Sequence, residues 1–277
     1  MHPGLGVGLG GSELTNAVRR PSGLKGLRPE EEGGSWLDAL SSLFFPSPCR
    51  ICQGPLTFHR SLICESCWEA IRLIEFPICP CCGTPFSWEE SQTSAVQFLC
   101  GTCRLQEPPF EQARSVAYYE GTMREAIHLF KYGKRQDMGR HLGRLMVSCF
   151  PPEWDLSAID LVLPIPLHLR RRWERGFNQS LILATALTDS LCLKLEARLL
   201  LRSRPTLPQS DLSLSEKFSN LKGAFSVRRP HKIEGQGILL VDDVYTSGAT
   251  AQEASKTLLK AGAERVFVYT LARSVLH

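Results

Sequence analysis

Short apolar runs alternate with longer amphipathic segments over the C-terminal two thirds of the chain. The runs are rich in Val, Ile and Leu, which is typical of strands buried on both faces of a parallel sheet. We expect strands at residues 115–119, 160–163, 197–201, 238–241 and 266–271, and helices at residues 122–132, 136–150, 177–191 and 251–262. Strands that alternate with helices predict a doubly wound α/β fold with a mostly parallel sheet.

The ends of two predicted helices carry recognisable signals. Thr122 and Glu125 match a capping box, in which a hydroxyl and a carboxylate satisfy the first free amides of a helix. Gly262 predicts the end of the last helix, since glycine is favoured just after a helix. The connections between the predicted elements therefore contain the turn chemistry that this fold class requires.

The N-terminal part of the chain has a different pattern. Residues 1–34 are rich in glycine and basic residues, which predicts a disordered leader without the apolar core of a signal peptide. A short amphipathic helix is expected at residues 35–45. No apolar run approaches the roughly 20 residues that cross a bilayer, so we expect a cytoplasmic protein with no membrane span. The predicted units are a leader at 1–34, a helix with a cysteine-rich module at 35–106, and an α/β domain at 107–277.

Eight of the 11 cysteines form four CxxC pairs, a spacing that lets two thiolates converge on one tetrahedral ion. The pattern predicts a double zinc ribbon with two structural Zn²⁺ sites, because four thiolates close a site against catalysis. Sequential pairing gives one site from Cys49, Cys52, Cys64 and Cys67, and a second site from Cys79, Cys82, Cys100 and Cys103. Interleaved pairing is the alternative that spacing leaves open. Four disulfides are rare in a cytosolic protein of this size.

The zinc prediction changes the interpretation of the charge. The chain has a formal net charge of +4, and eight thiolates with two Zn²⁺ bring this value to zero. Overall basicity is therefore no argument for a nucleic-acid partner.

The strand predicted at 238–241 is followed by two carboxylates and a loop of small residues. Asp242 and Asp243 can accept hydrogen bonds from a sugar diol or from water on Mg²⁺. The loop contains Thr246, Ser247, Gly248, Ala249 and Thr250 and leads into a predicted helix. A helix N-terminus offers free amides and a partial positive charge to a phosphate, and the hydroxyls add donors. An acidic N-cap without a ligand is the simpler interpretation, but it requires neither two acids nor so many small polar residues.

This element matches the phosphoribosyl pyrophosphate (PRPP) motif of type I phosphoribosyltransferases. Further motifs at residues 129–133, 160–167, 175–180, 202–209, 214–217 and 220–225 agree with one family. From about Tyr118 onward the chain resembles the ComF/GntX family of competence-related proteins, relatives of those enzymes. Lys217 stands where the family usually has Arg, and Ser247 where it usually has Thr. The lysine replaces a bidentate fork by a point charge, whereas the serine keeps a hydroxyl.

The resemblance implies roles for several residues. It implies that Asp242 and Asp243 hold the ribose of PRPP directly or through Mg²⁺, and that residues 246–250 hold its 5′-phosphate. Residues 164–168, which include Pro164, Ile165 and Pro166, form the implied pyrophosphate loop. The segment 202–217 is the implied flexible lid, with Arg202 and Arg204 closing over the leaving group.

The basic segment after the implied pyrophosphate loop has three interpretations. Arg170, Arg171, Arg172 and Arg175 can bind pyrophosphate, bind a nucleic-acid backbone, or form a solvated turn. His168 is a candidate general acid, although no partner carboxylate is identifiable and a structural role is the more common one. Asn178 and Gln179 are candidates for capping the next helix.

Two functions follow from the resemblance. One is a phosphoribosyltransferase that transfers the sugar from PRPP to an unidentified acceptor. The alternative is a non-catalytic PRPP-binding protein that engages single-stranded DNA or competence-machinery proteins during DNA uptake. Four aromatic residues near the cysteine pairs can stack on bases or form a small core, namely Phe58, Trp68, Phe86 and Trp88.

Overall fold

The computed structural model describes residues 48–56, 62–86, 98–133, 136–168, 173–204 and 213–275. The predicted leader and the helix expected at 35–45 lie outside the described residues. Helices are α2 (Glu65–Glu69), α4 (Gly101–Leu105), α5 (Gly121–Tyr132), α6 (Gln136–Ser148), α8 (Gln179–Leu191), α9 (Leu214–Leu221) and α10 (Ala249–Lys260). Strands are β1 (Gln112–Tyr118), β2 (Leu161–Pro164), β3 (Leu200–Arg202), β4 (Phe225–Val227), β5 (Gly237–Tyr245) and β6 (Arg265–Arg273), with 3-10 turns η1 (Leu156–Ala158) and η3 (Pro230–Lys232).

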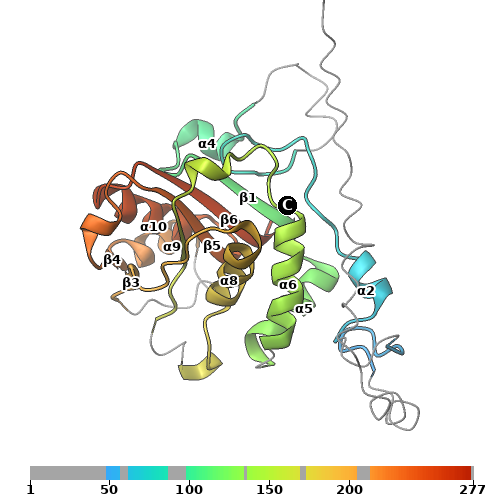
Figure 1. Cartoon of the computed structure of the whole chain (residues 1–277). Coiled ribbons are helices and arrows are strands. Elements are labelled where there is room, and N and C mark those ends of the chain that lie inside the picture. The colour runs from blue at the N-terminus through green and yellow to red at the C-terminus, as the bar shows by residue number, and fades with distance from the viewer. Residues whose placement is uncertain are drawn as a thin grey trace, which may run out of the picture.

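Four strands form one sheet in the order β1-β6-β5-β2, and every neighbouring pair is parallel. Helices α5, α6 and α8 cover one face, and α9 and α10 cover the other (Figure 1). The predicted α/β class with a mostly parallel sheet is therefore confirmed.

Strand β5 lies inside the sheet between β6 and β2, and both of its faces are buried. Leu239 and Val241 belong to the core beneath α5, α6 and α8, whereas Ile238 and Leu240 belong to the core beneath α10. All four side chains are fully buried. Burial of one such side chain stabilises the fold by about 1.5–3 kcal/mol, so this strand fixes the two cores relative to each other.

Three expectations from the sequence are wrong in detail. The strand predicted at 238–241 continues to Tyr245, because Val244 and Tyr245 still pair with β6. The strand predicted at 197–201 appears as β3, which leaves the main sheet and pairs antiparallel with β4, a strand that the pattern did not predict. The predicted capping box at Thr122 is absent, since α5 begins after Glu120 without a side-chain cap. A complete capping box instead starts α9, between Ser213 and Glu216.

Irregular segments lie along both outer strands of the sheet. Leu73 forms an antiparallel bridge with Ala117 of β1, and the amide of Ile74 donates to the carbonyl of Val116 at 2.9 Å. At the other side, Leu195 forms a parallel bridge with Val162 of β2. The cysteine-rich module is therefore hydrogen-bonded to β1 directly. Among the described residues, no helix is long and apolar enough to span a membrane.

Candidate functional site

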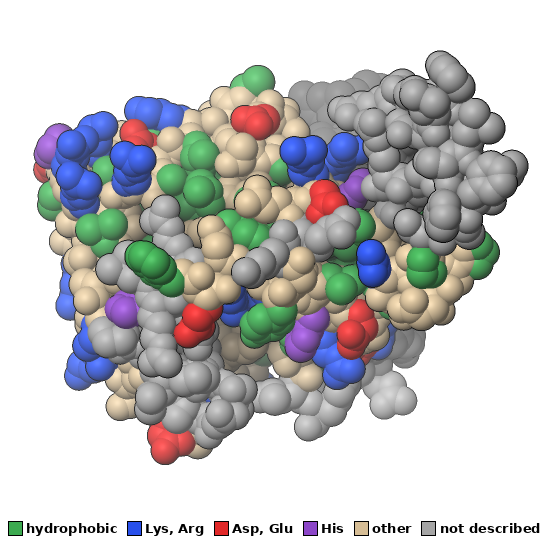
Figure 2. All heavy atoms as spheres, turned by 90° about the horizontal axis from the view of Figure 1, so that it is seen from below, with side chains coloured by type: hydrophobic (Ala, Val, Ile, Leu, Met, Phe, Trp, Pro, Cys, Tyr) green, Lys and Arg blue, Asp and Glu red, His purple; other side chains and the backbone are tan. Residues whose placement is uncertain are grey.

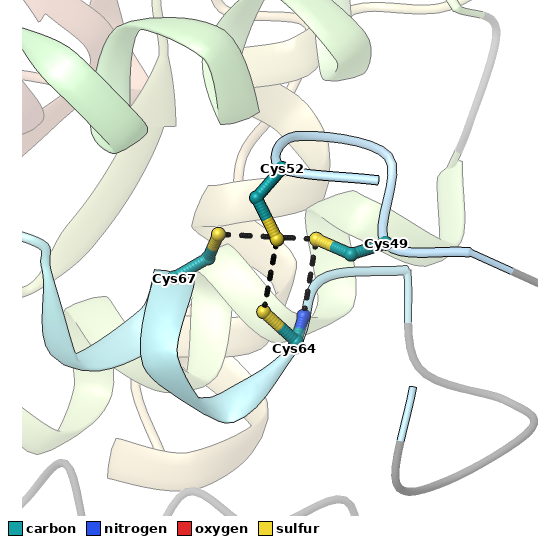
Figure 3. Close-up of side chains that lie close together, drawn as sticks. All are labelled: Cys49, Cys52, Cys64 and Cys67. Atoms are coloured by element: carbon teal, nitrogen blue, oxygen red, sulfur yellow. Dashed lines mark hydrogen bonds between the residues drawn. The ribbon is translucent and has the colours of Figure 1, made fainter. Parts of the chain in front are cut away.

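The eight paired cysteines converge into two groups of four. In each group the four sulfur atoms lie within 4.8 Å of one another. Figure 3 shows the first group, where the Sγ atoms of Cys49 and Cys67 are 3.8 Å apart and those of Cys52 and Cys64 are 3.5 Å apart. The second group consists of Cys79, Cys82, Cys100 and Cys103. The structure thus selects the sequential pairing over the interleaved one.

Both groups are built in the same way. Cys64 precedes α2 and Cys100 precedes α4, and each short helix carries the last cysteine of its group one turn later. The backbone amide of Cys64 donates to the Cys49 sulfur at 3.4 Å, and the amide of Cys100 donates to Cys79 at the same distance. Amides that point at sulfur favour thiolates, and four converging thiolates fit a tetrahedral Zn²⁺. The donor set therefore suits zinc in a structural role.

Asp242 and Asp243 lie in β5, just past the point where its pairing with β2 ends at Val241. Asp243 is buried and Asp242 is partly exposed. The hydroxyl of Ser180 donates to Oδ1 of Asp242 at 2.9 Å, and the amide of Asp243 donates to the same oxygen at 2.9 Å. The first carboxylate is thus oriented by α8 and by its own strand.

Lys131 is a site residue that the sequence analysis did not single out. Its Nζ lies 2.9 Å from Oδ1 of Asp243, and both side chains are nearly buried, with 14% and 12% exposed. Removal of one member of a buried ion pair costs about 3–5 kcal/mol, because the remaining charge has no compensation. The motif at 129–133 contained this residue, but nothing in the sequence connected it to Asp243.

The carboxylates of Asp242 and Asp243 have different electrostatic surroundings. Burial raises the pKa of Asp242 to about 7, and the charge of Asp243 acts in the same direction, whereas the Ser180 hydrogen bond acts against it. Asp243 is compensated directly by Lys131. Near neutral pH, Asp242 therefore exchanges a proton easily, and a cation or a sugar hydroxyl can take the place of that proton.

The small-residue loop follows β5 directly. Gly248 adopts φ +78° as the N-cap residue of α10, and the amide of Ala249 donates to the Ser247 hydroxyl at 3.4 Å. Thr246 is exposed, while Ser247 and Thr250 are partly exposed. The N-terminus of a 12-residue helix, with its first amides and the hydroxyls of the loop, therefore follows the two acids directly in the chain.

The predicted pyrophosphate loop lies beside Asp242. The amide of Ile165, between Pro164 and Pro166, donates to the carbonyl of Val241 at 2.9 Å. The side-chain amide of Asn178 donates to the carbonyl of Ile165 at 3.0 Å, and its oxygen caps α8 by accepting from the amide of Ser180. The carboxyl end of β2 thus approaches the carboxyl end of β5, as expected for a ligand crevice in this fold class.

The predicted arginines fall in different places. Arg175 donates to Gln179 at 3.2 Å and stacks over the ring of Tyr132, the residue after Lys131. Arg202 lies over the ring of Phe225, and Arg204 donates to the carbonyls of Asn220 and Lys222 at the end of α9. Arg175 therefore contacts α5 and α8, whereas the contacts described for the other two are to β4 and α9. The predicted Arg170, Arg171 and Arg172 lie outside the described residues, as does half of the predicted lid, residues 205–212.

Two of the four aromatic residues near the cysteine pairs can be placed. Trp68 packs against the core and lies 6.2 Å from the His141 ring, and Phe86 packs against the second core. These two residues serve as packing groups. Phe58 and Trp88 lie outside the described residues.

Comparisons with known proteins agree with both parts of the chain. Residues 40–104 match the model of the double zinc ribbon domain. The chain is 33% identical over 236 residues to DNA utilization protein YhgH of Escherichia coli (strain K12), covering 84% of this chain and 100% of that protein. It is 31% identical over 235 residues to competence protein F of Haemophilus influenzae (strain ATCC 51907 / DSM 11121 / KW20 / Rd), covering 83% and 99%.

A solved structure also matches. It is glutamine PRPP amidotransferase from B. subtilis complexed with ADP and GMP, with 18% identity and a TM-score of 0.31. The match covers 51% of this chain and 26% of that enzyme, so the chain spans about a quarter of its length.

Each cysteine group should bind its zinc independently. We expect Cys64→Ser to lower the zinc content from two ions to one per chain, and Cys100→Ser to do the same, because each substitution leaves only three thiolates at one site. Metal analysis of the purified variants measures this content. Cys192→Ser, an exposed cysteine outside both groups, should retain two ions. Loss of both ions in either single variant would contradict separate sites.

The raised pKa of Asp242 predicts a pH-dependent stability. Its contribution to stability is present below the unfolded pKa of about 4 and is lost as pH rises through about 7, because the folded ligand-free protein retains the proton. We therefore expect the melting temperature of Asp242→Asn, relative to the unsubstituted protein, to be higher at pH 8 than at pH 5 by about 2–4 °C. The exposed Asp189→Asn on α8 should show the same difference at both pH values. A constant difference for Asp242→Asn would argue against a buried titrating acid.

Proposed function

The chain belongs to the family of DNA utilization protein YhgH and competence protein F, and we propose that it binds PRPP with Mg²⁺ at the end of β5. The observation that carries this proposal is the order of chemical groups along the chain from the end of β5 into the start of α10. Two carboxylates, one of them with a pKa raised to about 7, are followed at once by the Thr246 and Ser247 hydroxyls and by the first backbone amides of α10. A sugar with a phosphate on its 5′-carbon requires these two kinds of partner side by side.

Different residues at the end of β5 and in the neighbouring loops contact different parts of the proposed ligand. The amides and hydroxyls of residues 246–250 hold the 5′-phosphate. Asp242 and Asp243 accept hydrogen bonds from the ribose hydroxyls and offer hard oxygen ligands that suit Mg²⁺. Mg²⁺, when bound, supplies positive charge that offsets the pyrophosphate. The segment 164–166 contacts Val241 beside these acids and is the expected neighbour of the pyrophosphate.

Lys131 provides a counter-charge for Asp243 and holds its side chain in place before the ligand arrives. Asp242, with its raised pKa, gives up a proton when it engages the ligand. Binding should therefore weaken as pH falls below about 7, since protons compete for the same carboxylate. Because Asp243 is paired with Lys131 and Asp242 can carry a proton, the two adjacent carboxylates can lie side by side.

We propose phosphoribosyl transfer as the reaction of this site. Pyrophosphate leaves C1 of the ribose with both bonding electrons, and a nitrogen nucleophile forms the new bond to C1. Such a reaction depends on orientation and on charge stabilisation, and it needs no covalent nucleophile on the protein.

A role with single-stranded DNA is the second candidate, and the similarity to a DNA utilization protein and to a competence protein favours it. Trp173 is 87% exposed and Tyr132 is 66% exposed, and Arg175 stacks over the tyrosine ring. Exposed aromatic rings beside arginine are the usual platform for unpaired bases. On the face seen in Figure 2, however, Lys and Arg side chains lie in separate groups between acidic and hydrophobic ones. The contact that we propose is centred on these two rings and Arg175.

A reduced compartment suits the paired thiols, which supports a cytoplasmic location.

Calorimetry with PRPP and Mg²⁺ tests the proposed ligand. We expect the full chain to bind, and we expect Asp242→Asn/Asp243→Asn to lose at least tenfold in affinity, because the ribose and Mg²⁺ partners are removed. Asp189→Asn should bind as the unsubstituted chain does. Pyrophosphate release, measured with a panel of nucleobases and amines, then separates turnover from binding alone. Equal affinity in the double variant would place the ligand elsewhere.

The DNA role predicts a salt-dependent affinity for a labelled single-stranded oligonucleotide, measured by fluorescence anisotropy. Each phosphate contact contributes about −0.7 to the slope of log affinity against log salt. Arg170→Ala/Arg171→Ala/Arg172→Ala should therefore flatten the slope by about 2. The matched variant Lys222→Ala/Lys256→Ala/Lys260→Ala removes the same charge from exposed positions near α9 and α10 and should change the slope less. Undetectable binding at low salt would rule out this role for the chain.

A further inference from the structure

Arg273, the last residue of β6, fastens the second cysteine group to the sheet. Its guanidinium donates to the carbonyl oxygen of Cys82 at 2.7 Å and to the hydroxyl of Thr84 at 2.6 Å, and it lies 3.7 Å from the Cys82 sulfur. Only 7% of this arginine is exposed. A buried, multiply bonded guanidinium holds a single position, so the 79–84 turn has a fixed place relative to β6.

The same turn is also fixed to β1. The amide of Ala113 donates to the carbonyl of Cys81 at 2.7 Å, and Arg114 donates to the carbonyl of Pro80 at 3.0 Å. A Cβ atom at Gly83 would lie 2.5 Å from the carbonyl oxygen of Ala113, so backbone packs directly on backbone there. The second cysteine group therefore cannot shift without disturbing two strands of the parallel sheet.

Tyr245 connects this arrangement to the small-residue loop. The guanidinium carbon of Arg273 lies 4.2 Å from the centroid of the Tyr245 ring, and Phe110 meets that ring edge-on at 6.5 Å. The hydroxyl of Tyr245 lies against Gly248, where an added Cβ would overlap it. Tyr245 is only 6% exposed, so a buried chain of contacts runs from Cys82 to the residue that begins α10.

We propose that the second zinc site positions the phosphate loop through Arg273 and Tyr245. Closure of the site by its ion holds the 79–84 turn in place, the turn holds the guanidinium, and the guanidinium holds the ring that supports Gly248. Close-packed interiors transmit such constraints because side chains cannot adjust without opening voids. Arg273 and Tyr245 are positioning residues, since they act on the loop and not on the ligand.

The first cysteine group provides an internal contrast. Its buried members Cys49, Cys64 and Cys67 pack with the core beneath α5 and α6, whereas Cys79, Cys82, Cys100 and Cys103 pack with the core that contains Tyr245 and Ala249. The proposal therefore assigns the coupling to one zinc site and not to the other. It also requires reciprocity, because a ligand that orders the loop must then retain the second zinc more firmly.

Hydrogen exchange of the full-length protein without ligand tests the positioning. We expect exchange of the amides at residues 246–250 to accelerate at least about fivefold in Cys100→Ser and to stay unchanged in Cys52→Ser. Arg273→Met keeps all eight cysteines of the two groups, so it tests the positioning even if Cys100→Ser fails to fold. It should accelerate the same amides while the zinc content stays at two ions. Unchanged exchange in Arg273→Met, or equal acceleration in both cysteine variants, would overturn the proposal.

Competition for zinc with a chromogenic chelator tests the reciprocal effect and rests on the proposed function. With PRPP and Mg²⁺ present, the affinity of the second site for zinc, measured in Cys52→Ser by equilibrium competition with the chelator, should rise by about 5-fold to 150-fold. The zinc affinity of the first site, measured in Cys100→Ser, should not change. If calorimetry detects PRPP binding but the zinc affinity of the second site is unaltered, the coupling fails and the proposed function stands. If calorimetry detects no PRPP binding, the proposed function fails, and the exchange experiment alone decides the positioning.

Discussion

Two adjacent carboxylates, one buried and one partly exposed, repel each other, and the surrounding side chains compensate the two charges differently. Lys131 from α5 lies 2.9 Å from Asp243, so this acid has its counter-charge within the protein. Asp242 receives two neutral hydrogen bonds and no direct cation, and its pKa rises to about 7. An electrostatically incomplete site of this kind gains stability when a cation or a donor arrives. Three elements, α5, α8 and β5, must hold their positions for this imbalance to persist.

The cysteine-rich module is an integral part of this arrangement. Its backbone is hydrogen-bonded to β1 at two separate places, near Ile74 and near Ala113, and Arg273 of β6 fastens it once more. Its two cysteine groups join the cores on opposite faces of the sheet. A metal site with four protein ligands has no open position for a substrate, so its value lies in the geometry that it imposes on its surroundings.

The sequence was most informative where one local signal decides the outcome. The four CxxC pairs predicted both metal sites, and the apolar runs predicted the class of sheet. It was less informative where strand pairing decides how far a strand extends. Strand β5 continues past Asp243 because Ala272 and Arg273 of β6 pair with its last residues. Lys131 and Asp243 are far apart in the chain, so no pattern could join them. The capping box at Thr122 failed because the chain reaches α5 from a different residue, Glu120. The division into units at residue 106 stays a prediction.

The bridges at Leu73 and Leu195 have a consequence for the behaviour of the protein in crowded solution. Parallel strands that end a sheet expose a row of amides and carbonyls, and a second molecule can add its own strand to that row. Here Leu73 lies along β1 and Leu195 lies along β2, so part of each row is already used by the same chain. Short irregular segments are poor templates for further strands. The fold therefore carries its own protection against aggregation through its sheet edges.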